Sequence, residues 1–429
     1  MKRKYVPFFI LFVCIYALQA QTPQKDISRN PILSSGNYLV YPSQNLPNLT
    51  PAPKGYVPFY INHYGRHGSR WMTQIYNYEN PINELSIAKR NGKLTVRGQD
   101  LLSKLLIVYQ AAMNRSGELT DIGAKQHKAI ATRMFKNYPQ VFAGNAYIEA
   151  RSTIIIRSIL SMENELLELQ ALNPKLSITH DASAADMWYM NYNDRGPIEA
   201  IREAKTVQDS INEFRDHKIH TKRFISQLIN DEKFANDSID CMDLMCSVFD
   251  IANSMQGHHL NLSFFDLFSN DERYNLWQVG NAKWYVKYGY SPITKSLVPS
   301  LEINLLKNMI ESADKAIISG KNGATLRFGH DTSLYPLVCL LELNDYGRVI
   351  NNLCDIADYF QDYKIIPMAS NIQMIFYRNK TKKDIIVKIL LNEHEMSLPL
   401  SSDIKPYYYW ENVKDFYEKK LNNGHEDGN

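Results

Sequence analysis

The pentapeptide Arg66-His67-Gly68-Ser69-Arg70 combines residue types that suit phosphate chemistry. Two arginines stand on either side of one histidine, and unpaired charges of this kind are costly in a protein core. Guanidinium groups, in contrast, match the oxygens of a phosphate group in pairs. Histidine can also form covalent intermediates, so His67 could attack a phosphorus atom. The pentapeptide therefore predicts a phosphate-binding loop with a nucleophile at its centre.

Two later segments carry the other groups that phosphoryl transfer needs. Arg151 could add a third positive charge for the equatorial phosphate oxygens without a metal, and His330 could add a hydrogen bond. Asp331 could protonate the leaving alcohol and later take a proton from the attacking water. Each reaction step thus has a candidate side chain.

Each assignment also has a competing interpretation. His63 and His67 have the spacing of a helical metal pair, but glycines beside them and a preceding strand-like run argue against a helix. We therefore predict no metal site. Asp331 could instead cap the helix that follows it, and Arg151 could be an ordinary ion-pair partner. The prediction of a site depends on the joint occurrence of these residues.

The candidate residues all follow strand-like segments. Strands are predicted at 56–62, 146–150 and 324–328, directly before the pentapeptide, Arg151 and His330. In open α/β sheets, ligand sites lie at the carboxyl ends of the strands. The three loops are therefore expected to converge on one pocket.

The organisation of the chain predicts an α/β core interrupted by helices. Helical patterns follow the first two loops at 124–138, where Thr120 is a good N-cap, and at 154–172. Between 174 and 305 the pattern becomes almost wholly helical, which predicts an inserted helical cap. The core, a largely parallel sheet flanked by helices, is then discontinuous and spans 56–173 and 306–415, with further strands near 371–378 and 385–391.

The two ends of the chain are expected to lie outside that core. Residues 21–55 are rich in Pro, Asn, Ser and Gln and predict an extended lead-in. Residues 416–429 are charged and predict a frayed tail.

Residues 1–20 have the build of a secretory signal. Basic residues precede an apolar run from Tyr5 to Leu18, and Ala20 is a small residue suited to cleavage. This predicts an exported protein, periplasmic or secreted. Cys14 lies inside the run without the small preceding residue of a lipoprotein signal, which argues against a lipid anchor. No later stretch is long and apolar enough to cross a bilayer, so no membrane span is expected in the mature chain.

The mature chain is expected to carry no net charge. The full chain has 48 basic and 45 acidic residues, and the signal contains three of the basic ones and no acidic one. A general attraction to nucleic acid or anionic membrane is therefore not predicted. The expected partner is a small phosphomonoester, bound by local clustering of charge.

Four cysteines remain after processing: Cys241, Cys246, Cys339 and Cys354. In an exported protein they could form up to two disulfides, with Cys339 and Cys354 a reasonable pair. Buried free thiols are an equally good interpretation.

These motifs together resemble the histidine acid phosphatase branch of the histidine phosphatase superfamily. That family has an Arg-His-Gly-x-Arg loop, a Leu-Thr-x-x-Gly helix start, an Arg-Ser-Thr-x-x-x-Arg segment with a third phosphate-binding arginine, and a His-Asp pair. They match residues 66–70, 119–123, 151–157 and 330–331. The resemblance implies the roles given above, a phosphohistidine intermediate, no cofactor and an α/β core with a helical cap.

A closer resemblance is to the multiple inositol polyphosphate phosphatase subgroup, which includes one class of phytases. The runs at 327–337, 371–378 and 390–399 are similar to it. That subgroup usually reads His-Ala-Glu, whereas this chain reads His330-Asp331-Thr332, with the acid one residue earlier, as in acid phosphatases and the other histidine-type phytases. With this one difference, the resemblance favours inositol polyphosphates as substrates. The alternatives are a broad-specificity acid phosphatase, a sugar-phosphate phosphatase and a non-catalytic phosphate-binding module.

Basic residues between the first two motifs allow two interpretations. Lys89, Arg90, Lys93 and Arg97 could line a highly anionic pocket or form a solvated surface, and we favour the surface.

Overall fold

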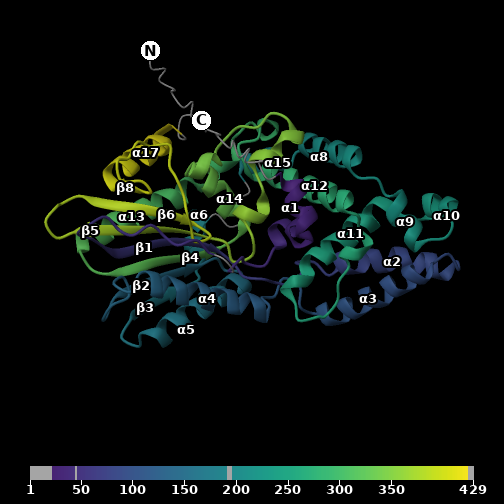
Figure 1. The fold of residues 1–429 in the computed structure, drawn as a ribbon, viewed down its shortest axis with the longest axis horizontal. Helices are drawn as coiled ribbons and strands as arrows, with labels where there is room; N and C mark the ends of the chain where they lie inside the picture. Colours follow the sequence, from purple (N-terminus) through teal and green to yellow (C-terminus); the bar gives the residue numbers. More distant parts are fainter. Residues whose placement is uncertain (1–21, 44–45, 191–195, 424–429) are drawn as a thin grey trace, which may run out of the picture.

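The computed structural model describes residues 22–43, 46–190 and 196–423. The predicted signal at 1–20 lies outside the described residues. A mixed sheet with its flanking helices forms one part of the molecule, and a group of helices lies beside it (Figure 1). In the described part of the chain, no helix has the length and apolar character needed to span a membrane.

The sheet has the strand order β3-β2-β4-β1-β5-β6-β7, with β8 paired to β6. Strands β3, β2, β4 and β1 are parallel neighbours, whereas β5 runs antiparallel to β1 and β6 antiparallel to β5. The predicted α/β class with a largely parallel sheet is confirmed. The strands are β1 (Tyr56–Arg66), β2 (Tyr147–Ser152), β3 (Ser177–Asp181), β4 (Gly323–Gly329), β5 (Asn371–Asn379), β6 (Ile385–Leu391), β7 (His394–Glu395) and β8 (Tyr407–Tyr409).

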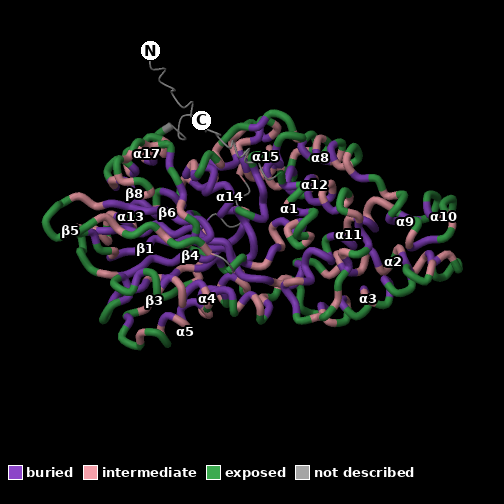
Figure 2. Tube along the Cα trace, in the orientation of Figure 1, coloured by how far each residue is buried: buried purple, intermediate pink, exposed green. Residues whose placement is uncertain are grey.

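Helices cover both faces of the sheet. Alternation along β1 sends Ile61 toward α4 (Asp121–Asn137) and α5 (Ile156–Leu172), and Tyr60 and Tyr64 toward the opposite face. That face is covered by α13 (Ile303–Ser319), α14 (Asp331–Leu340) and α17 (Trp410–Asn423). The central strands are therefore buried on both sides, and exposed segments lie on the outer helices (Figure 2).

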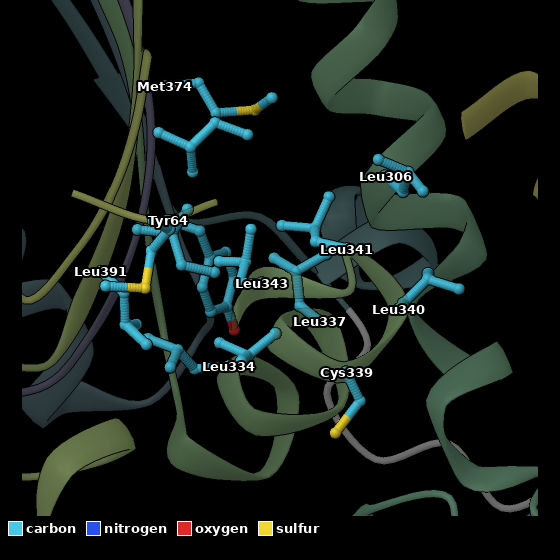
Figure 3. Close-up of a cluster of buried hydrophobic side chains, with 14 of the residues drawn as sticks. Tyr64, Leu306, Leu334, Leu337, Cys339, Leu340, Leu341, Leu343, Met374 and Leu391 are labelled. Atoms are coloured by element: carbon cyan, nitrogen blue, oxygen red, sulfur yellow. The ribbon is translucent and has the colours of Figure 1, made fainter. Parts of the chain in front are cut away.

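The packing of α14 fixes the position of the helix that follows His330. Leu334 and Leu337 lie against Tyr64 of β1 and Leu391 of β6 (Figure 3). All four side chains are almost fully buried. Burial of one such leucine contributes about 1.5–3 kcal/mol to stability. The start of α14 is therefore held firmly at the carboxyl end of the sheet.

A second hydrophobic cluster builds the helical part of the molecule from two stretches of chain. Helices α2 (Tyr76–Arg90) and α3 (Val96–Ala112) pack against α9 (Lys222–Leu228), α10 (Glu232–Ser238) and α11 (Cys241–Ser254). The helices expected between 174 and 305 are present. The boundaries of the cap at residues 174 and 305 stay a prediction. Helices α2 and α3, which precede residue 174, belong to the same hydrophobic cluster as α9 to α11.

The remaining helices complete the fold. The longest, α12 (Asn270–Tyr288), begins with a capping box in which Ser269 and Glu272 bind each other's backbone N–H. The others are α1 (Pro23–Arg29), α6 (Met187–Met190), α7 (Pro197–Arg202), α8 (Lys205–Lys218), α15 (Ile356–Tyr359) and α16 (Asp362–Ile365). Short 3-10 turns are η1 (Pro31–Tyr38), η2 (Ala184–Asp186), η3 (Met255–Gly257), η4 (Phe265–Leu267), η5 (Pro292–Thr294), η6 (Val298–Glu302), η7 (Leu343–Asp345) and η8 (Leu353–Asp355).

Two predictions about the chain ends are wrong. The first part of the expected extended lead-in folds into α1 and η1, each begun by a proline at its first helical position, whereas residues 39–43 and 46–55 contain no helix or strand. The expected frayed tail is helical as far as Asn423, and Tyr417 of α17 is fully buried against the core. Residues 424–429 lie outside the described residues.

The four cysteines are free thiols, so the disulfide considered between Cys339 and Cys354 does not form. Cys339 is buried in α14, whereas Cys354 is exposed.

Candidate active site

The site lies where the parallel strands β1, β2 and β4 end side by side. The His67 N–H donates to the Gly329 carbonyl (3.0 Å), and the Thr153 N–H donates to the Phe328 carbonyl (2.9 Å). The three polar loops that follow these strands therefore converge, as the sequence predicted.

Helices α4 and α5 hold the loop after β1 from behind. The Gly68 N–H donates to Ser161 Oγ (3.1 Å), and the Ser69 N–H donates to Gln126 Oε1 (2.8 Å). A Cβ atom on Gly68 would lie 2.5 Å from the Gly123 carbonyl oxygen, so the loop and the start of α4 touch backbone to backbone. The predicted N-cap at Thr120 is present, and its Oγ1 accepts from the Gly123 N–H. Glycine in both motifs is thus a packing requirement.

His67 is buried and has one ring nitrogen fixed. Its Nδ1 lies 2.9 Å from the Gly68 carbonyl, which can only accept, so Nδ1 carries the proton and Nε2 keeps its lone pair. Burial, followed by the positive charges of Arg157 and Arg66, holds the pKa of His67 well below its ordinary value. The imidazole is therefore neutral and able to act as a nucleophile.

His330 lies beside His67, with ring centres 5.6 Å apart. Its Nε2 is 3.1 Å from Thr153 Oγ1. Burial, together with Arg157, lowers the pKa of His330 to about 3, although Asp331 acts in the opposite direction. A neutral His330 can donate one hydrogen bond to a bound phosphate without adding charge.

Arg66 and Asp331 form a buried ion pair at the end of β1 and the start of α14. Arg66 Nη2 is 2.6 Å from Asp331 Oδ2, and Asn37 Nδ2 donates to the same oxygen (3.0 Å). Burial alone would raise the pKa of Asp331, but Arg66 and Arg70 hold it below its ordinary value. The carboxyl group is therefore ionised near neutral pH.

Some guanidinium N–H groups of the loop have no hydrogen-bond partner among the described residues. The Nε atoms of Arg66 and Arg70 are buried without one. Buried charged donors left in this way are costly, and the oxygens of a phosphate group would satisfy them.

A cavity of roughly 690 Å³ is lined by Arg70, His330 and Asp331 from these loops. Its walls come from η1, α7, α11 and α12 as well as from the ends of the strands. Charged lining residues are nearly balanced, with five basic (Arg70, Arg157, Arg202, Lys283 and Lys287) and four acidic (Glu199, Asp250, Asp331 and Asp362). Aromatic rings of α12 also line it, and Trp284 and Tyr288 lie 4.8 Å apart between ring centres.

The predicted placement of Arg151 in this site is wrong. Strand alternation puts Arg151 on the face of β2 that carries Glu149, and its guanidinium pairs with Glu149 (2.9 Å) and Asp186 (3.6 Å). It lines a different groove, on the sheet face near α13. Arg157, in the first turn of α5, lines the site cavity instead. The third arginine of the site is therefore the last residue of the predicted motif.

The helical metal pair does not form, because residues 63–66 belong to β1 and the chain at 67–70 forms no helical turn. His63 packs against Phe328 under the sheet, with ring centres 5.4 Å apart. In the described ranges, no group of three or more metal-ligating side chains is placed to hold an ion.

The basic residues between the first two motifs form a surface. Lys93 pairs with Asp231 and Arg97 with Asp266, and none of the four lines the site cavity.

Sequence reasoning missed two polar residues of the site. Asn37 comes from η1, and the buried Asp362 comes from the start of α16. Neither lies in a motif, so no sequence signal indicated them. Arg157, in contrast, was visible in the Arg-Ser-Thr-x-x-x-Arg segment.

Comparisons with known proteins identify a family and a shared fold. A sequence model of the histidine phosphatase superfamily (branch 2) matches residues 65–392. No curated protein sequence matches the chain.

Several solved structures share the fold. The multiple inositol polyphosphate phosphatase of Bifidobacterium longum, in complex with inositol hexasulfate, has a TM-score of 0.75 at 18% identity, over 90% of this chain and 97% of that one. A phytase from D. castellii has a TM-score of 0.68 at 14% identity, over 95% and 88%. A Hafnia alvei phytase, in complex with myo-inositol hexakis sulphate, has a TM-score of 0.52 at 11% identity, over 86% and 97%.

Proposed function

This chain belongs to branch 2 of the histidine phosphatase superfamily and is a phosphatase, and on that premise we propose that it hydrolyses phosphomonoesters through a phosphohistidine on His67, without a metal. The observation that carries the proposal is the neutral imidazole of His67 beside the buried guanidinium groups of Arg66 and Arg70, whose Nε atoms have no hydrogen-bond partner among the described residues. These groups supply the positive charge that a transferring phosphoryl group needs.

In the first half of the reaction, His67 Nε2 attacks phosphorus and the bond from phosphorus to the ester oxygen breaks. Arg66, Arg70 and Arg157 stabilise the equatorial oxygens, as electrostatic groups placed in advance of the reaction do. Asp331, in its protonated form, gives its proton to the leaving oxygen, so the first product is a neutral alcohol.

In the second half, water replaces the alcohol. The Asp331 carboxylate takes a proton from that water as its oxygen attacks phosphorus and the bond from phosphorus to Nε2 breaks. Inorganic phosphate leaves, and His67 returns to its neutral form.

The proposed substrates are inositol polyphosphates. The fold shared with the Bifidobacterium longum enzyme supports this class, as do the cavity cations Arg202, Lys283 and Lys287 on α7 and α12. These cations could bind phosphate groups that are not being cleaved.

A second candidate is a phosphatase of broad specificity or one for sugar phosphates. Two of the cavity cations are already engaged, since Arg202 pairs with Glu199 (3.5 Å) and Lys287 with Glu203 (2.7 Å). The rings of Trp284 and Tyr288 in the same wall suit an uncharged sugar or aryl group better than a phosphate group.

Measurements of phosphate release test both the proposed metal-independent catalysis and the proposed substrate class. Wild-type protein should release phosphate from an aryl phosphate and retain this activity with a chelator present. Comparing kcat/KM on phytate, a sugar phosphate and an aryl phosphate separates the two substrate classes. Strong inhibition by the chelator would contradict metal independence, and no release from any phosphomonoester would contradict catalysis and leave a binding module.

We also propose that the protein is exported, on the basis of residues 1–20. Expression of the full chain in a bacterium followed by N-terminal sequencing tests this. Export predicts a mature protein that begins near residue 21, in the periplasm or medium, whereas an uncleaved chain in the cytoplasm would contradict it.

A further inference from the structure

Asn37, in the 3-10 segment η1, links three parts of the active site. Its side-chain Nδ2 donates to Asp331 Oδ2 (3.0 Å). Its carbonyl accepts from Arg66 Nη1 (2.6 Å), and its N–H donates to Asp362 Oδ2 (3.2 Å). The backbone of Asn37 is therefore fixed by groups other than the side chain that reaches Asp331.

Asp362 anchors this segment to α12. Its Oδ1 accepts from Trp277 Nε1 of α12 (2.8 Å) and from the Tyr363 N–H (2.8 Å). Gly36 has φ +55°, and a Cβ atom there would lie 2.4 Å from Asp362 Oδ2. This close contact in a left-handed backbone conformation holds Asn37 in place before any substrate binds.

The two carboxyl oxygens of Asp331 have unequal surroundings. Oδ2 lies 2.6 Å from Arg66 Nη2 in an ion pair and accepts a hydrogen bond from Asn37 Nδ2, whereas Oδ1 accepts from the Thr332 N–H (3.1 Å). A positive charge beside a carboxylate oxygen opposes its protonation. Hydrogen bonds to a carboxylate oxygen oppose its protonation. A proton is therefore favoured on Oδ1 over Oδ2.

Other charged and titratable groups also face Asp331. Those that interact with it come from β1, the loop after it, α12 and the start of α14, and they are Arg66, Arg70, His330, Tyr64 and Tyr288. Asn37 differs from these groups because its amide is neutral at every pH, so its effect on Asp331 does not vary with its own titration.

We propose that Asn37 is a positioning residue that holds Oδ2 of Asp331 and leaves Oδ1 to carry the proton for the leaving group. This inference rests on the proposed phosphatase function. Asn37 lies before residue 65, where the family match begins, so it belongs to a part of the chain that the family motifs do not cover.

Two substitutions at this position test the role. Asn37→Ala removes the side-chain hydrogen bond and leaves the backbone contacts. Asn37→Asp keeps the shape but places a second carboxylate beside Asp331. Asn48→Ala, at an exposed position of the same N-terminal stretch, is the control.

The expected readout is the pH profile of kcat/KM, which reports ionisations of the free enzyme. Because the amide favours the ionised form of Asp331, its removal should let Asp331 keep its proton to higher pH. The falling limb should move up by about half to one pH unit in Asn37→Ala and further in Asn37→Asp. The control should match wild type.

A second readout separates proton donation from general damage to the site. An alkyl phosphate has a poor leaving group and needs the proton more than an aryl phosphate does. We expect kcat/KM of Asn37→Ala to fall about tenfold on the alkyl phosphate but only about twofold on the aryl phosphate.

The outcomes are distinguishable. If the wild-type protein is active but Asn37→Ala shows an unshifted falling limb and equal losses on both substrates, the role of Asn37 is overturned and the phosphatase function stands. A wild-type protein without activity would overturn the function itself. If Asn37→Ala does not fold by circular dichroism, the same-shaped Asn37→Asp decides, and an unshifted limb there also overturns the inference.

Discussion

Arg151 and Arg157 belong to one sequence motif, but the fold sends them to different cavities. The motif predicted that an arginine binds the phosphate, but it did not indicate whether this is Arg151 or Arg157. The decision comes from the end of β2, where alternation turns Arg151 toward Glu149 and the first turn of α5 brings Arg157 to the cavity.

Paired substitutions test this correction. Arg157→Ala should lower kcat/KM for an aryl phosphate by about 100-fold or more, as expected for loss of one group that stabilises the transition state. Arg151→Ala should stay within about threefold of wild type, since a partly exposed ion pair contributes little. The reverse order would show that Arg151 holds the phosphate.

The pH dependence of catalysis depends on Asp331. In the free enzyme Arg66 and Arg70 hold the pKa of this carboxyl group below its ordinary value, and the acid step needs its protonated form. Activity should therefore fall as pH rises through the acidic range, with kcat/KM highest at acidic pH.

Asp331→Asn tests whether Asp331 causes this fall in kcat/KM with rising pH, the falling limb of the pH profile. The amide cannot give up a proton, so kcat/KM on an alkyl phosphate should drop by about 100-fold or more and lose its falling limb. An unchanged limb in this variant, or an alkaline optimum in wild type, would assign the ionisation to another group.

Most of the site could be predicted, because its residues belong to motifs that lie at or directly after the ends of predicted strands. Arg66, His67, Arg70, His330 and Asp331 meet as expected. Residues in irregular segments could not be predicted in this way, because their positions depend on contacts with distant parts of the chain. Asn37 lies 294 positions from the carboxylate it contacts.

At the scale of elements, the approach of the loop to α4 is set by two glycines. A Cβ atom on Gly123 would lie 2.3 Å from the Ser69 carbonyl oxygen, and backbone cannot move aside as a side chain can. Sequence showed both glycines, but only the structure shows that they face each other.

Gly123→Ala should therefore separate the loop from the helix. We expect a loss of at least about 2 kcal/mol in the free energy of unfolding, together with a fall in kcat/KM. Gly280→Ala, in α12 where a Cβ atom meets open space, should instead raise stability by about 0.5–1 kcal/mol. Urea unfolding of both variants measures the difference, and equal stabilities would contradict the packing argument.

Regular elements were easier to predict than chain ends. The strands at β4, β5 and β6 and the helices α4 and α5 follow clear periodicity and lie within a few residues of the expected ranges. The predictions made from amino-acid composition were wrong at η1 and α17. Asn37 of η1 is held by tertiary hydrogen bonds, and the charged α17 presents one apolar side to the core.

At the scale of the whole molecule, buried histidines make stability depend on pH. Burial is the main cause that lowers the pKa of His63 and His258 to about 4 and that of His330 to about 3. The unfolded chain binds these protons near the ordinary value of 6.5. Each histidine therefore reduces stability by about 1.4 kcal/mol per pH unit as pH falls from 6.5 toward its folded pKa.

Asp362 acts in the opposite direction. Burial raises its pKa to about 6, so the folded state holds a proton there that the unfolded chain has lost. Its contribution to stability increases as pH falls through the same range, and it offsets one histidine.

His258→Phe isolates one of these contributions. His258 stacks on Trp71 with ring centres 3.9 Å apart, and neither ring nitrogen has a hydrogen-bond partner among the described residues. Phenylalanine should keep the stacking and reduce the loss of stability by about 1.4 kcal/mol per pH unit between about pH 6 and 4.5. The exposed His217→Phe should leave the slope unchanged in chemical denaturation, and an equal slope in wild type and His258→Phe would contradict this contribution.

The central claim is that the chain transfers phosphate through His67. It is tested most directly by mixing wild-type protein with an aryl phosphate, quenching in alkali within one turnover and locating the phosphoryl group by mass spectrometry. The account predicts a phosphoryl group on His67 in wild type, and neither a phosphoprotein nor phosphate release in His67→Ala. A phosphoryl group on another residue, or phosphate release by His67→Ala at the wild-type rate, would contradict it.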